Sequence, residues 1–156
     1  MGVNIRAKGQ TGERDVQKIL NDVVEEVYRE NQWGVLNPKD LPFQRNQNQS
    51  AVGGADLSNP FKLEIEVKRQ EALSINTWWN QCVASGSRVQ GSTPILIFKQ
   101  NHKKWRIMMF ADLPIKPPGR TTPNGLSGIR VEITLEDFKV WWKAYFLDWL
   151  LHNNDR

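Results

Sequence analysis

Two acidic residues and a lysine lie close together in the sequence, on segments whose pattern predicts extended structure. Asp56 closes the short run 53–56. In the stretch that follows, apolar and polar residues alternate: Phe61, Leu63, Ile65 and Val67 with Lys62, Glu64, Glu66 and Lys68. This period of two is typical of a strand with one buried and one polar face. Glu66 and Lys68 are therefore predicted to project side by side.

Carboxylates and an amine in this arrangement suit the hydrolysis of a phosphodiester bond. The reaction needs an attacking water, neutralisation of the phosphate charge and help for the leaving oxygen, and a hard divalent cation held by carboxylates supplies much of this. Asp56 and Glu66 are the natural ligands, and the carbonyl oxygen of Val67 is a candidate third. Lys68 could orient or help deprotonate the water, or stabilise the developing charge.

A helix is predicted to bring a further acid to these strands. Thr11 is suited to cap a helix that starts at Gly12 and ends near Glu30, with apolar residues at helical spacing. Glu13 lies in its first turn, near the inward stripe, where it could face the site. A purely structural role is the alternative, because an acid at this position complements the positive end of the helix.

The remaining elements are predicted to complete a mixed sheet flanked by helices. We expect a helix over 74–85, a hairpin of strands over 94–99 and 105–110, an extended loop over 113–128 and an edge strand over 129–134. Thr134 is predicted to cap a final aromatic helix that runs to about residue 152. Its apolar surface is wider than one stripe, which favours packing in the core or against a second copy over stacking on bases.

Composition points to one compact domain over residues 1–156. The 156 residues are 39% hydrophobic and carry a net charge of +4, and a basic balance of this size is only a weak pointer to nucleic acid. One cysteine, Cys82, excludes an internal disulfide, and we expect a reducing, cytoplasmic setting in a prokaryotic cell or a phage-infected host. No apolar run is long enough to span a membrane.

These pieces together resemble the PD-(D/E)xK nuclease superfamily, and within it the archaeal-type and phage-type Holliday-junction resolvases. The matching pieces, in order, are Lys8-Gly9, Glu13-Arg14, Arg45, Ser50, Gly54-Ala55-Asp56 and Glu66-Val67-Lys68. The usual proline before the aspartate is replaced by Ala55. The resemblance covers roughly residues 8–105 and implies a restriction-endonuclease-like α/β core.

The resemblance also implies roles for individual residues. Glu13 would complete an acidic metal centre with Asp56, Glu66 and the Val67 carbonyl, and Gln81 on the following helix would lie near the site. The expected cofactor is Mg²⁺, with Mn²⁺ as a substitute. The expected partner is branched DNA, above all a four-way junction, which a homodimer would cut. Lys8, Arg14, Arg45 and Ser50 are the predicted DNA-binding residues.

Several residues keep a second interpretation. Glu64 is a candidate auxiliary ligand, although a solvated strand residue is the favoured interpretation. Trp78 and Trp79 point about 100° apart on a helix, so one is predicted to be buried and the other exposed or at an interface. A nuclease of the same superfamily that cuts duplex or flapped DNA, and a DNA-binding module without hydrolysis, are the alternative functions.

Overall fold

The computed structural model of the chain describes residues 5–46, 55–88, 90–114, 118–119 and 128–153, with the side chains from residue 9 onward. Within these residues, three helices and a short 3-10 turn are interleaved with six strands, in the predicted order of elements. The helices are α1 (Ile5–Glu30), α2 (Ile75–Gly86) and α3 (Leu135–Asn153), and the 3-10 turn is η1 (Pro38–Asp40). The strands are β1 (Gln44–Arg45), β2 (Leu57–Ser58), β3 (Leu63–Gln70), β4 (Thr93–Gln100), β5 (Arg106–Phe110) and β6 (Arg130–Thr134).

The six strands form one mixed sheet in the order β1-β2-β3-β4-β5-β6. All neighbours pair antiparallel except β3 and β4, which run parallel and are joined through α2. A parallel pair needs such a crossover, because its strands begin at the same edge of the sheet. The sheet is therefore an α/β arrangement with β3 in its interior, and the predicted fold class is confirmed.

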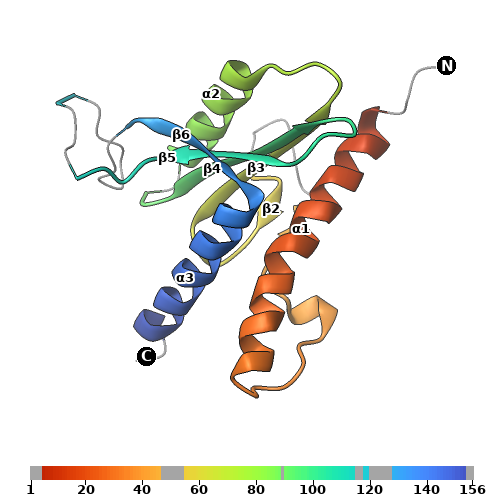
Figure 1. Ribbon diagram of the computed structural model, residues 1–156, viewed down its shortest axis with the longest axis vertical. Helices are drawn as coiled ribbons and strands as arrows, with labels where there is room; N and C mark the ends of the chain where they lie inside the picture. Colours follow the sequence, from red (N-terminus) through yellow and green to blue (C-terminus); the bar gives the residue numbers. More distant parts are fainter. Residues whose placement is uncertain (1–4, 47–54, 89, 115–117, 120–127, 154–156) are drawn as a thin grey trace.

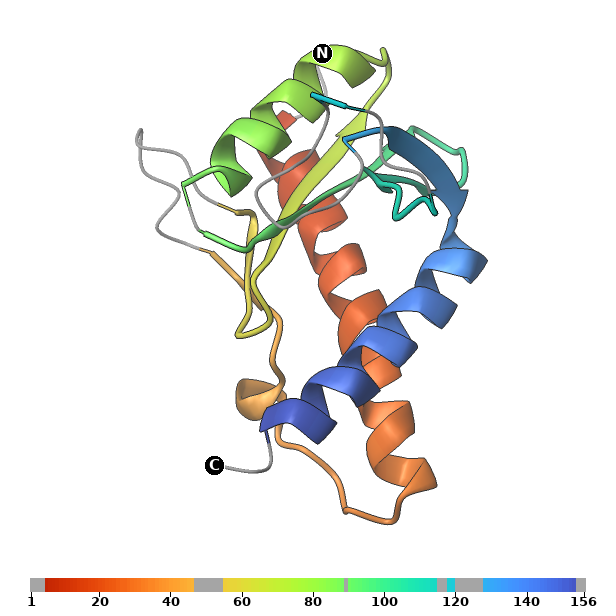
Figure 2. The ribbon, with the colours of Figure 1, turned by 90° about the vertical axis from the view of Figure 1, so that its left-hand side faces the viewer.

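Helices cover both faces of the sheet (Figures 1 and 2). α1 and α3 lie on one face and α2 on the other. α1 buries a stripe at helical spacing, Val16, Leu20, Val23, Val24 and Val27, against the apolar side of β3. The opposite face packs a second, smaller cluster between α2 and strands β4 and β5.

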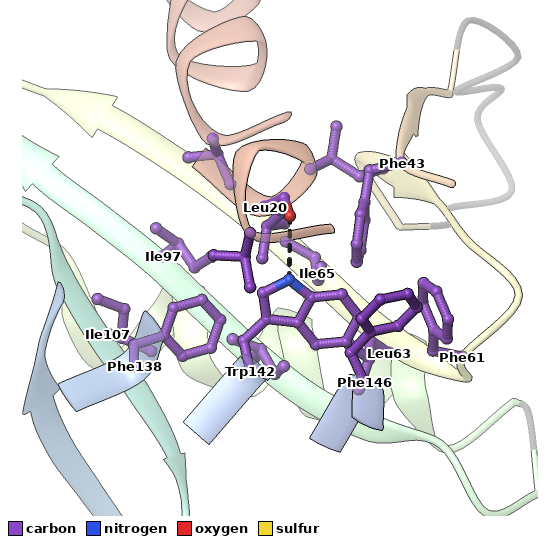
Figure 3. Packing of buried hydrophobic residues seen from close by; sticks show 14 of the residues in the cluster. Leu20, Phe43, Phe61, Leu63, Ile65, Ile97, Ile107, Phe138, Trp142 and Phe146 are labelled. Carbon is purple, nitrogen blue, oxygen red and sulfur yellow. Dashed lines mark hydrogen bonds between the residues drawn. The ribbon is translucent and has the colours of Figure 1, made fainter. Parts of the chain in front are cut away.

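Helix α3 closes the larger core (Figure 3). The Thr134 hydroxyl accepts a hydrogen bond from the backbone N–H of Asp137 at 3.1 Å, so the predicted cap is confirmed. Trp142 is fully buried, with its ring against Phe43 and Phe61. Its Nε1 donates to the carbonyl of Leu20 at 3.0 Å, which satisfies the only polar atom that the indole brings into the core.

The start of α1 differs from the prediction. The helix begins at Ile5, so Thr11 lies within it and is not a cap. Two glycines, Gly9 and Gly12, are tolerated in its interior at about 1 kcal/mol each relative to alanine. At Gly12 the helix crosses β3 closely, since a Cβ placed there would lie 3.4 Å from the Cβ of Arg69. The tertiary contact outweighs the local preference.

Both tryptophans of α2 are buried, so the expectation that one would be exposed is wrong. Trp78 packs against Phe98 on β4, and Trp79 packs against Phe110 on β5. The helix lies over two neighbouring strands, and indole rings are long enough to reach both from positions 100° apart. The predicted hairpin of β4 and β5 and the predicted edge strand β6 are confirmed. Most of the predicted loop over 113–128 lies outside the described residues.

Candidate active site

Strand β3 carries the central acid and the lysine. Its burial alternates as predicted, with Leu63, Ile65 and Val67 buried against α1. Glu66 and Lys68 lie on the other face with partly exposed side chains. Their charged ends meet, since the Lys68 Nζ lies 3.5 Å from the Glu66 Oε1. The alternation of the sequence thus places a carboxylate and an ammonium group next to each other.

Asp56 is held against the same strand by backbone hydrogen bonds. Its N–H donates to the Ile65 carbonyl at 2.9 Å, and its carbonyl accepts from the Asn46 N–H at 2.9 Å. The ladder between β2 and β3 pairs Leu57 with Ile65. Two residues further along β3, the side chain of Asp56 replaces the backbone as the hydrogen-bond acceptor, because its Oδ2 accepts the N–H of Val67 at 2.7 Å.

Burial gives the Asp56 carboxyl an unusual affinity for protons. The side chain is 8% exposed, and desolvation together with repulsion from Glu66 raises its pKa to about 7. The hydrogen bond from Val67 and the charge of Lys68 act in the opposite direction. Burial likewise raises the pKa of Glu66, against the stabilising charge of Lys68. A buried and a partly buried carboxyl that repel each other are a candidate site for a cation or a shared proton.

A second ion pair approaches this centre from α1 and β1. The Glu13 Oε2 lies 3.0 Å from the Arg45 Nε, and both side chains are mostly buried. The negative charge of Glu13 disfavours ionisation of both Asp56 and Glu66, so the three carboxyls share one electrostatic environment. Among the described residues, no three acids, histidines or cysteines are close enough to form a complete cation cage. Glu13 as a metal ligand stays a prediction.

A family comparison identifies the kind of protein to which this site belongs. Residues 4–124 match the family model described as "Phage putative PDDEXK endonuclease". The chain belongs to this PDDEXK endonuclease family. No match was found among curated proteins or among solved structures. The matched segment contains Glu13, Asp56, Glu66 and Lys68, and it ends before β6 and α3.

The donor set of this PDDEXK site fits a hard cation such as Mg²⁺. Mg²⁺ keeps several waters and is commonly bound through only one or two carboxylates. Asp56 and Glu66 supply two, and the Asp56 Oδ2 also accepts the Val67 N–H. The N–H and C=O of one strand residue point to the same side. The Val67 carbonyl is therefore directed toward Asp56, as a third oxygen ligand would need to be.

The other predicted site residues lie at different distances from this centre. Gln81 is on α2 with an exposed side chain, and Arg14 is exposed on α1. Lys8 lies in α1, where only its backbone is described, and Ser50 lies outside the described residues. Arg45 binds Glu13. These predicted roles in catalysis or DNA binding remain predictions.

Two further residues shape the endonuclease site in ways that the sequence did not reveal. The Asn46 side chain donates to the Ala55 carbonyl at 3.1 Å, and its backbone N–H donates to the Asp56 carbonyl, so Asn46 ties the end of β1 to both residues. Glu64 is half-buried near α2, where desolvation raises its pKa and the charge of Arg88 opposes the rise. In the sequence, Asn46 is one member of the polar run 44–50, whose composition equally fits a linker.

Proposed function

We propose that this PDDEXK endonuclease is a Mg²⁺-dependent enzyme that cuts branched DNA, with four-way junctions as its preferred substrate. The observation that carries the hydrolytic part is the arrangement of Asp56, Glu66 and Lys68, in which two mutually repelling carboxyls, one buried and one partly buried, lie beside an ammonium group. A protein that only bound DNA would gain nothing from burying such charges. The preference for junctions rests on the resemblance of the motif order to Holliday-junction resolvases.

Each residue of the centre has a role in the proposed reaction. Asp56 and Glu66 would hold the cation, and the Val67 carbonyl would add a third oxygen. When bound, the cation supplies Lewis acidity and lowers the pKa of its water. Lys68 orients the attacking water or neutralises the charge that develops on the phosphate. Glu13, which is paired with Arg45, adds negative charge near Asp56 and Glu66.

A dimer would let two such centres make paired cuts across a junction. The solvent side of α3 supports this part of the proposal. Val140, Leu147 and Leu151 are 71%, 38% and 73% exposed and recur at helical spacing. A second copy of the chain would cover them. Sedimentation of the wild type beside a Val140→Glu/Leu151→Glu variant tests this contact.

Cleavage of defined DNA substrates tests the proposed activity. End-labelled four-way junction, matched linear duplex and flapped DNA are each incubated with the protein, with Mg²⁺, Mn²⁺ or EDTA. Asp56→Asn is expected to abolish cutting and retain binding, whereas Asp40→Asn, at an exposed acid in η1, leaves cutting unchanged. Paired, metal-dependent nicks at the junction support a resolvase. Equal cutting of linear duplex indicates a general nuclease, and binding without cutting by the wild type refutes the enzyme.

A further inference from the structure

A group of cations lies at the end of the sheet just beyond Lys68. Strands β3 and β4 run parallel, so their carboxyl ends meet at one edge, where Arg69 pairs in register with Lys99. The turn between β4 and β5 follows directly and exposes Lys103 and Lys104. Four positive side chains, from two strands and a turn, therefore gather at one end of the sheet.

The cations at this end lack acidic partners within the described part of the chain. Arg69 is the clearest case, since its Nε is buried and has no hydrogen-bond partner among the described residues. A buried guanidinium N–H without an acceptor is costly, and an incoming oxyanion would satisfy it. The neighbouring Arg106 differs, because its guanidinium donates two hydrogen bonds to the Glu132 carboxylate, at 2.9 Å and 2.7 Å.

Contacts with neighbouring groups hold Lys99 and the β4–β5 turn in place. The Lys99 Nζ lies 4.9 Å from the centre of the Trp105 ring, so the indole face holds the ammonium group in place. The turn is closed by a backbone hydrogen bond from the Lys103 N–H to the Gln100 carbonyl at 3.2 Å. These contacts fix where the charges lie before any ligand arrives.

This end of the sheet is continuous with the active site. A Cβ placed on Gly12 would lie 3.4 Å from the Cβ of Arg69, and 3.6 Å from both Val67 Cγ1 and Trp105 Cη2. Gly12 directly precedes Glu13. Arg69 follows Lys68 on β3 but lies on the α1 face with Val67, whereas Lys68 lies on the opposite face, so the two groups adjoin at the end of the strand. The turn lies only a few residues beyond Lys68 along the strand direction, or about 7–10 Å at ~3.3 Å a residue. A DNA strand places a phosphate about every 3.4 Å along its axis, so this corresponds to roughly two or three phosphates.

We propose that Arg69, Lys99, Lys103 and Lys104 form a second phosphate-binding surface, which holds the DNA backbone beside the phosphate that is cut. The inference rests on the proposed function and adds a direction to it: the bound strand leaves the acidic centre along β3 toward the β4–β5 turn. These contacts position the strand and read no sequence. The charges also compensate for the acidic centre, which on its own repels a polyanion.

Salt-dependent binding tests this surface without any cutting. A labelled duplex is titrated with protein in EDTA at salt concentrations from about 50 to 300 mM. In Lys103→Gln/Lys104→Gln, two phosphate contacts are removed, so the slope of log K against log salt is expected to fall by about 1.8. At about 0.1 M salt, affinity is expected to weaken roughly 10- to 60-fold. Lys99→Gln is expected to lower the slope by about 0.9.

A matched variant controls for overall charge. Lys39→Gln/Lys62→Gln removes the same two charges from exposed positions, in η1 and before the opposite end of β3, and is expected to bind like the wild type. The proposed phosphate-binding surface is refuted if Lys103→Gln/Lys104→Gln keeps the wild-type slope, or if both double variants lose affinity equally. The proposed function stands in either case, as long as the wild type still cuts. If the wild type neither binds nor cuts DNA, the proposed function fails as well, and the two failures are thereby distinguished.

Discussion

Replacement of Asp56 by asparagine is expected to make the metal-free protein more stable while it removes cutting. The shift of the Asp56 pKa from its ordinary 3.8 to about 7 means that ionising the buried carboxyl destabilises the folded state. Three pKa units correspond to about 4 kcal/mol at a pH above 7. Asparagine can still accept the Val67 N–H, and its buried amide group costs about 1–2 kcal/mol if unpaired. The expected net gain is about 2–3 kcal/mol.

The pH dependence of this effect separates the electrostatic explanation from a packing effect. The folded state keeps the proton of Asp56 between pH 4 and 7, where the unfolded chain has lost it, so wild-type stability falls as pH rises through this window. The advantage of the Asp56→Asn variant is therefore full at pH 8 and smaller by about 3 kcal/mol at pH 4.5. Urea unfolding in EDTA at both pH values measures it. A variant that is less stable than the wild type at pH 8, or a difference that does not change with pH, would refute the reasoning.

Three further substitutions are expected to change the free energy of unfolding, measured by urea titration. Gly12→Ala is expected to stabilise by about 0.5–1 kcal/mol, because alanine favours the helix and its Cβ meets ordinary contact distances; a loss would show that α1 and β3 cannot accept the methyl group. Asn21→Ala is expected to cost about 2–3 kcal/mol, since the buried amide bonds both the N–H and the carbonyl of Phe43; an unchanged midpoint would contradict this. Trp142→Phe is expected to cost about 2–3 kcal/mol through the lost bond to Leu20 and a smaller ring; wild-type stability would exclude both contributions.

Local patterns were sufficient to predict the elements that build the site. Alternation along β3 predicted which side chains face the core, and helical spacing from Val16 to Val27 predicted the buried side of α1. Such periodic signals are strong because burial of one face depends on them directly. The start of α1 was predicted less well, since the cost of glycine inside a helix was outweighed by the packing of this part of α1 on β3.

Contacts between distant segments could not be predicted in this way. The pairing of Glu13 with Arg45 joins residues 32 positions apart, and no local pattern specifies it. Burial of both Trp78 and Trp79 depends on the width of the sheet beneath α2, which emerges only when β4 and β5 pair. The raised pKa of Asp56 similarly depends on the exclusion of water by the folded chain.

The larger core extends beyond the segment that defines the family. The family match ends at residue 124, yet the ring of Trp142, eighteen positions later, fills the space between Phe43 and Phe61. A chain shortened to the matched segment would keep Glu13, Asp56, Glu66 and Lys68 but would leave these aromatic rings in water. We expect it to aggregate rather than to bind DNA. The smallest independently folding nuclease is therefore longer than its catalytic signature, and searches that trim the chain to that signature would discard a helix on which the core depends.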